Sequence, residues 1–168
     1  MFETHDISPS LTQLFSELVD GASAPGGAFI LNSGDAGLLG SLDKLTAAQA
    51  SQSLEGGATI AAHAEHLYYG LSLMNRWASE GGDPFGDATW EEAWKTTTVD
   101  ERAWAAIRGR LRDVAHRWLL ALNVPRRVNQ AELNGMIGSI AHLSYHMGAI
   151  RQIAARARGP REGTFDNA

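Results

Sequence analysis

The sequence predicts an all-α bundle, and three observations support this prediction. Apolar residues recur at three- and four-residue steps over several long stretches, which is the period of an amphipathic helix. Glycine, proline, threonine and aspartate residues separate these stretches, and no stretch shows the alternation of apolar and polar residues that is typical of a strand. The chain has 168 residues, 44% hydrophobic and 20% charged, and no internal repeat, which fits one folded domain.

The first part of the chain contains one long predicted helix and two shorter ones. Apolar residues at helical spacing begin after Ser8 and continue to Gly21, where the first helix is expected to end. Residues 22–34 are rich in glycine and contain a proline, so we expect a loop there. Asp35 can cap a second, leucine-rich stretch, and Thr46 can cap a short continuation.

Three longer helices follow. Thr59 can cap a helix that runs from residue 60 to about residue 80, where two glycines and a proline follow. Residues 87–95 are expected to form a connector with a short turn. The apolar residues of 99–122 keep helical spacing throughout, and the last helix should span about 130–157. The five tryptophans are expected to anchor the core or an interface, and they are Trp77, Trp90, Trp94, Trp104 and Trp118.

Composition excludes several classes of function. The chain has no cysteine, which excludes disulfides, thiolate nucleophiles, cysteine-bound zinc and iron–sulfur clusters. The net charge of −5 does not suit a nucleic-acid-binding surface. No run of about 18 apolar residues predicts a membrane span, and the first ten residues do not resemble a signal peptide. We expect a cytoplasmic protein with a single domain over 1–158 and a polar tail over 159–168.

Two histidines four residues apart form the first candidate site. His142 and His146 lie within the last predicted helix, about 40° apart around it and one turn apart along it. Two ring nitrogens can therefore converge on one ion from a single helix, and neutral imidazole suits zinc, nickel, copper and iron. The alternative is that one histidine packs in the core while the other reaches solvent.

Small residues share the helical face that carries this pair. Gly135, Gly138, Ser139 and Ala149 would leave space beside an ion for water or for a substrate. Close packing of two helices requires small residues as well, and the sequence does not distinguish between the two explanations.

A third histidine ligand is expected from the helix over 60–80. His66 shares a face with Tyr69, whereas His63 lies about 60° away around the helix. We therefore favour His66 as the third ligand and His63 as a neighbouring pocket residue, with the reverse assignment as the alternative.

Other catalytic motifs are missing from the sequence. A zinc peptidase of the H-E-x-x-H type needs a glutamate directly after the first histidine, and Leu143 occupies that position. Neither a G-x-S-x-G nucleophile motif nor a phosphate-binding G-x-x-x-x-G-K-[ST] loop is present.

Three further residues are candidates for contacts with a substrate. Tyr69 lies about one turn from His66 and could donate a hydrogen bond to a substrate oxygen, although an ordinary position at the edge of the core explains it too. Arg76 and Arg151 could bind a carboxylate at the mouth of the pocket, or could form surface ion pairs instead.

The order of these motifs resembles the DinB-like (YfiT) superfamily. The resemblance rests on a helix that begins Thr59-Ile60 and carries a central histidine, and on His142-x-x-x-His146 followed by Met147-Gly148-Ala149-Ile150-Arg151-Gln152. It covers about residues 35–158. Two positions depart from the family pattern H-x-x-x-H-R-G-Q-I, because Met147 replaces arginine and Ala149 replaces glutamine.

The resemblance implies an up-down four-helix bundle with extra short helices in its connections. It also implies a divalent metal, with zinc or nickel favoured, bound by His66, His142 and His146. Some members of the family use low-molecular-weight thiols. We therefore expect a metal-dependent transferase or hydrolase that activates a thiol or water on a small-molecule substrate, and a homodimer. The competing expectation is a non-catalytic dimeric bundle that the metal stabilises and that has a structural or binding role.

Overall fold

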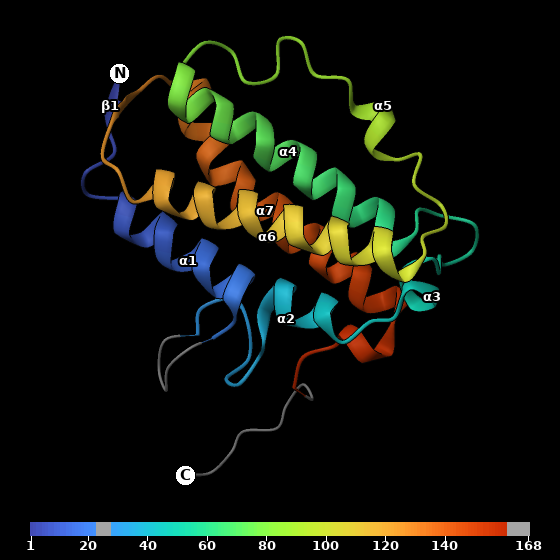
Figure 1. The fold of residues 1–168 in the computed structure, drawn as a ribbon. Helices are drawn as coiled ribbons and strands as arrows, with labels where there is room; N and C mark the ends of the chain where they lie inside the picture. Colours follow the sequence, from blue (N-terminus) through green and yellow to red (C-terminus); the bar gives the residue numbers. More distant parts are fainter. Residues whose placement is uncertain (23–27, 161–168) are drawn as a thin grey trace.

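A computed structural model describes residues 1–22 and 28–160, and this part of the chain is mainly helical (Figure 1). The all-α prediction is confirmed. The four longest helices are α1 (Ser8–Asp20), α4 (Ile60–Glu80), α6 (Glu101–Leu122) and α7 (Gln130–Ile153). The shorter elements are α2 (Gly37–Asp43), α3 (Ala47–Ala50), α5 (Trp90–Ala93) and a 3-10 turn, η1 (Ala155–Ala157). Residues 23–27 of the predicted loop and residues 161–168 of the predicted tail lie outside the described residues.

Side-chain caps set where several helices begin. Thr59 accepts a hydrogen bond from the backbone N–H of Ala62 at the start of α4, as the sequence predicts. Thr46 and Asn129 each form a reciprocal capping box at the start of α3 and α7. Asp100 caps α6, so this helix begins at Glu101 rather than at residue 99.

The last helix ends four residues earlier than the sequence predicts. Ala154 has an extended backbone, and a 3-10 turn follows it. The side chain of Arg158 folds back, and its Nε donates to the carbonyl of Arg151 at 3.1 Å. Ala154 and Ala157 are both buried, so the turn packs the end of the chain onto the core instead of extending the helix.

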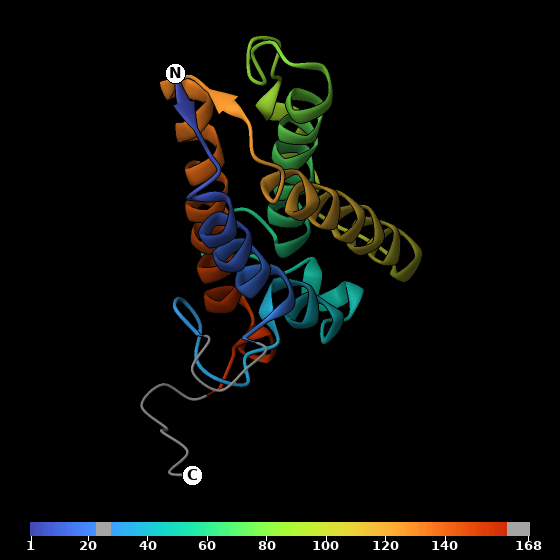
Figure 2. The same ribbon diagram turned by 90° about the vertical axis from the view of Figure 1, so that its left-hand side faces the viewer.

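A two-residue ladder, which the sequence does not predict, joins distant parts of the chain. Strand β1 (Phe2–Glu3) pairs in the antiparallel direction with β2 (Arg127–Val128), as Figure 2 shows. The adjacent Thr4 is fully buried, and its side-chain oxygen accepts from the backbone N–H of Arg126. The start of the chain is thereby fixed to the connection between α6 and α7.

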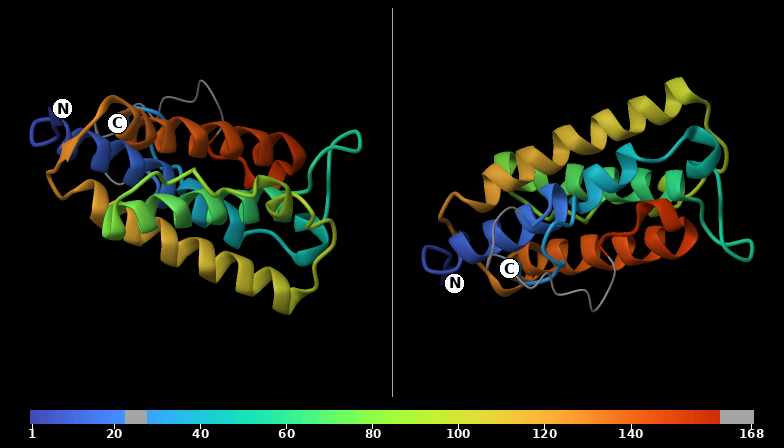
Figure 3. Two further views of the ribbon diagram at one scale, coloured as in Figure 1. Left: turned by 90° about the horizontal axis from the view of Figure 1, so that it is seen from above. Right: turned by 90° about the horizontal axis from the view of Figure 1, so that it is seen from below.

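The long helices surround a common apolar core. Helices α1 and α4 each pack against both α6 and α7, which lie on opposite sides of the molecule (Figure 3). Trp104 and Trp118 are completely buried in the core, and each indole N–H has an acceptor, the carbonyl of Leu45 and the hydroxyl of Ser139 respectively. No helix of the described residues is long and apolar enough to cross a membrane.

Helices α4 and α6 run in the same direction, which differs from the expected up-down order. Glu65 and Trp77, near the two ends of α4, contact Arg110 and Trp118 in the same order along α6. The direction of the colour gradient in Figure 1 agrees. Helix α7 is antiparallel to α4, because Trp77 near the end of α4 donates to Glu132 near the start of α7.

The connection between α4 and α6 explains this parallel arrangement. Residues 81–100 return along the side of α4, so that α6 starts again near the beginning of α4. Three hydrogen-bonded contacts fix this return path along α4: Arg76 with Asp87, Tyr69 with Thr89, and Thr59 with Thr96. This segment also passes directly over the histidines, and so it forms one wall of the site described next.

Candidate metal centre

Three histidines from two helices point their ring nitrogens at one another. His66 extends from α4, and His142 and His146 extend from α7. The Nε2 atom of His142 lies 3.0 Å from Nε2 of His66 and 2.9 Å from Nε2 of His146. One ligand nitrogen from each of the three histidines lies within 4.8 Å of the others, and the group could hold a metal ion.

Hydrogen bonding among the three rings does not account for this convergence. The Nε2 atom of a neutral imidazole carries either one proton or one lone pair, so it can take part in one good hydrogen bond. His142 Nε2 nevertheless has two imidazole nitrogens within about 3.0 Å. A cation that accepts three lone pairs would use all three nitrogens at once.

The distances fit a first-row divalent metal. With metal–nitrogen bonds of about 2.0–2.1 Å, neighbouring nitrogens lie about 2.8–3.0 Å apart in an octahedral site and about 3.3–3.4 Å apart in a tetrahedral one. The two distances from His142, 2.9 and 3.0 Å, match the octahedral spacing, and the third pair, His66 with His146, lies within the 4.8 Å that encloses all three nitrogens.

Burial keeps the imidazoles in the neutral form that binds metal. His66 and His146 are 7% and 3% exposed. Loss of hydration, followed by repulsion from His142 and His63, lowers the pKa of His66 to about 4. The same loss of hydration, with repulsion from His142, His66 and His63, lowers the pKa of His146 to about 3. Burial lowers the pKa of His142 as well, so all three rings offer lone pairs at neutral pH.

His63 contacts the far side of one of these rings. Its Nδ1 lies 3.0 Å from Nδ1 of His146, whereas the Nε2 of His146 faces the other two histidines. His63 is therefore placed to orient His146 from behind, and it is absent from the group whose nitrogens converge. Of the two α4 histidines that the sequence offers as the third ligand, the geometry brings His66 into the centre and leaves His63 at its edge.

Two tryptophans of the connector cover the histidines. The ring of Trp94 stacks on His66 with the centroids 4.2 Å apart and the planes at 25°, and it also meets His63 edge-on at 5.4 Å. The ring centroid of Trp90 lies 5.4 Å from that of His66. The sequence predicts these tryptophans only as anchors of the core or an interface. The available signal was their position in the connector, next to the histidine-bearing helix.

The other candidate residues have different partners. The Tyr69 hydroxyl accepts a hydrogen bond from the backbone N–H of Thr89 at 2.8 Å, which holds the connector beside α4. Arg76 forms an exposed ion pair with Asp87 in the same connector. Arg151 pairs with a buried carboxylate, that of Asp35, at 2.7 Å.

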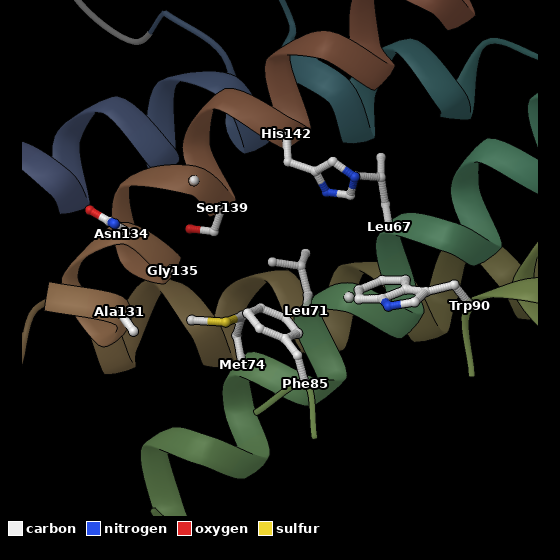
Figure 4. Close-up of a pocket in the computed structure, with 12 residues that line it drawn as sticks. Leu67, Leu71, Met74, Phe85, Trp90, Ala131, Asn134, Gly135, Ser139 and His142 are labelled. Carbon is white, nitrogen blue, oxygen red and sulfur yellow. The ribbon is translucent and has the colours of Figure 1, made fainter. Parts of the chain in front are cut away.

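A cavity opens beside His142 between α4 and α7 (Figure 4). It has a volume of about 540 Å³. Leu67, Leu71 and Met74 face it from α4, Ser139 and His142 face it from α7, and Phe85 and Trp90 close it from the connector. Neither Tyr69, Arg76 nor Arg151 is among the residues that line it.

Some of the small residues predicted on the histidine face of α7 line this cavity. Gly135, Gly138 and Ser139 line it, whereas Ala149 does not. A Cβ atom at Gly138 would have no atom within 4 Å, so this glycine leaves open space. A Cβ atom at Gly135 would lie 3.3 Å from the end of Met74, so that glycine serves close packing. Both explanations offered for the small residues therefore hold, at different positions.

Comparison with protein-family models, with curated proteins and with solved structures finds no match for this chain.

Proposed function

We propose that this protein binds a divalent metal ion through His66, His142 and His146 and uses it to act on a small molecule. The convergence of three Nε2 atoms from two helices carries the proposal. We further propose that the fold is a four-helix bundle of the DinB-like kind, with α1, α4, α6 and α7 as its helices. The resemblance in sequence and the packing of α1 and α4 against both α6 and α7 support this assignment.

The donor set determines what a bound ion could do. Three neutral imidazoles add no negative charge, so the full charge of a divalent ion would remain, and three protein ligands leave room for a further ligand. When bound, such an ion lowers the pKa of a coordinated water or thiol and polarises a carbonyl. Zinc and nickel both suit imidazole ligands.

The protein's own residues would shape the reaction around this centre. Trp94 and Trp90 shield His66 from solvent on the connector side. His63 holds the ring of His146 in place through the contact between their Nδ1 atoms. The cavity between α4 and α7 reaches His142 and gives a small molecule access to the centre. A metal-dependent transferase or hydrolase, acting with a thiol or with water, fits these features best.

Metal analysis of purified protein tests this proposal. We expect stoichiometric metal in the wild type and a loss of most of it in the His142→Ala, His146→Ala double variant. A His116→Ala variant serves as the control, because His116 is partly exposed and pairs with Asp20 away from the site. Undiminished stoichiometric metal in the double variant would refute the assignment.

A purely structural role for the metal is the second candidate, and one observation favours it. The ligands come from both α4 and α7, so a bound ion would crosslink two helices of the core. Thermal melts with and without chelator, together with assays of thiol transfer and hydrolysis, separate the two roles. Strong destabilisation by chelator without turnover would support the structural role, and turnover that disappears with the metal would support the catalytic one. Sedimentation of the same samples tests the expected homodimer.

A further inference from the structure

We propose that the cavity between α4 and α7 binds an uncharged, elongated and largely apolar small molecule, one end of which lies against His142. The inference deepens the proposed function and rests on it for the reaction. Binding of the apolar body depends on the cavity alone, and it can therefore be measured separately.

The lining of the cavity indicates the chemistry of the ligand. None of the twelve residues that line it carries an acidic or basic side chain other than His142. Aliphatic side chains form one wall and the rings of Phe85 and Trp90, whose centroids are 6.0 Å apart, form another. A charged ligand would lose its hydration here without gaining an ionic partner, whereas an apolar ring would replace water at little cost.

Few polar groups of the cavity remain available to a ligand. The hydroxyl of Ser139 already donates to the carbonyl of Met136 at 2.7 Å and accepts from the indole of Trp118 at 2.9 Å. Asn134 is exposed, and its Oδ1 accepts from Gln130, so its amide N–H groups are the part of this side chain that can donate to a ligand. A ligand would therefore meet a polar contact at Asn134, at the solvent end, and at His142, at the inner end.

The spacing of these two polar positions gives the length of the site. Asn134 and His142 are eight residues apart on one helix, which corresponds to about 12 Å along its axis. The small residues on both helices lie within this span. Gly70 is at the inner end, where a Cβ atom would lie 3.7 Å from Trp90 and 3.9 Å from His142. Gly138 is nearer the middle of the span.

The glycines provide a direct way to fill the cavity. Leucine at position 70 would project between Trp90 and His142, into the space that a ligand would occupy. Leucine at position 138 would enter the same cavity from α7 without meeting a neighbour at its Cβ. Gly109 on α6 offers a matched control, because it is exposed, a Cβ atom added to it would have no atom within 4 Å, and it does not line the cavity.

The experiment measures binding of N-phenyl-1-naphthylamine, an uncharged two-ring probe whose fluorescence rises in apolar surroundings. Wild type, Gly70→Leu, Gly138→Leu and Gly109→Leu are titrated in zinc-loaded and in metal-free form. We expect saturable binding to the wild type and to Gly109→Leu. Binding to Gly70→Leu should be weaker by at least about tenfold, since a mismatch of one methylene in an apolar pocket already changes binding by about 10–200-fold.

Four results separate this proposal from the metal proposal. Unchanged probe affinity in both cavity-filling variants would overturn the inference, and so would tighter binding of the anionic 8-anilinonaphthalene-1-sulfonate in the same cavity. Where Gly70→Leu does not fold, as judged by circular dichroism, Gly138→Leu decides. Normal zinc content with lost probe binding in the filled variants supports the site. A wild type that takes up no zinc when zinc is added, yet binds the probe, would refute only the metal assignment.

Discussion

Replacement of His63 by phenylalanine should weaken metal binding while leaving the three proposed ligands in place. With a metal on Nε2 of His146, the proton of that ring lies on Nδ1, and it donates to Nδ1 of His63, 3.0 Å away. Phenylalanine keeps an aromatic ring that can meet Trp94 edge-on, as His63 does at 5.4 Å, but it removes the acceptor. The change therefore isolates a single hydrogen bond.

The magnitude follows from the burial of the donor. His146 is 3% exposed, so its N–H would have little access to water once His63 is replaced. A buried donor without a partner costs about 1–3 kcal/mol. Since about 1.4 kcal/mol corresponds to a tenfold change, the affinity should fall by about 5–150-fold, which agrees with the range of about 10–100-fold for groups that orient metal ligands.

Competition between the protein and a chromophoric chelator for zinc at neutral pH measures this effect. His116→Phe is the matched control, since it makes the same substitution at a histidine whose partner is Asp20. The melting temperature of the metal-free proteins shows whether the fold itself is weakened. Zinc affinity equal to that of wild type in His63→Phe would refute the positioning role.

Three further perturbations test the fold and the electrostatics of the site. Asp35→Ala should lower the free energy of unfolding by about 3–5 kcal/mol, because it leaves the Arg151 guanidinium without the carboxylate that lies 2.7 Å from it. Urea titrations measure this loss. A loss below about 1 kcal/mol, the value of a surface ion pair, would contradict the prediction. Thr59→Ala should cost about 1 kcal/mol by removing the cap of α4, with Thr59→Ser as the control that retains an oxygen. In the metal-free protein, burial lowers the pKa of His66 from 6.5 to about 4 and that of His146 from 6.5 to about 3. As the pH falls, these histidines are therefore protonated in the unfolded chain before they are protonated in the folded protein. Stability should therefore be complete above about pH 6.5 and should fall as the pH decreases towards 3, and a melting temperature that does not change over this interval would show that the rings are not held neutral.

Local signals in the sequence were sufficient to predict the position of most helices. Thr59 and Thr46 begin α4 and α3 as predicted, because a cap depends on residues within one turn. The pairing of His142 with His146 depends on helical spacing alone, and their Nε2 atoms lie 2.9 Å apart. The end of α7 was predicted less well, because the turn after Ile153 packs Ala154 and Ala157 into the core and brings Arg158 back to Arg151, contacts that exist only in the folded chain.

Features that depend on contacts between distant parts of the chain could not be predicted from the sequence. A strand of two residues, such as β1, is too short to show an alternating pattern. The parallel direction of α4 and α6 follows from a connector of about twenty residues, and spacing does not indicate the path of such a segment. The same path places Trp90 and Trp94 against the histidines, which is why their role in the site was missed.

The stacking of Trp94 on His66 gives the protein a built-in optical reporter. Indole emission is quenched by energy transfer to ions with partly filled d shells, and zinc, with a filled shell, lacks this property. The ring centroids of Trp94 and Trp90 lie 4.2 and 5.4 Å from that of His66, and energy transfer is strongest at short distance. Nickel or cobalt arriving at the histidines should therefore lower the indole emission of the protein. Occupancy could then be followed in real time on the unlabelled protein, with zinc as the silent competitor.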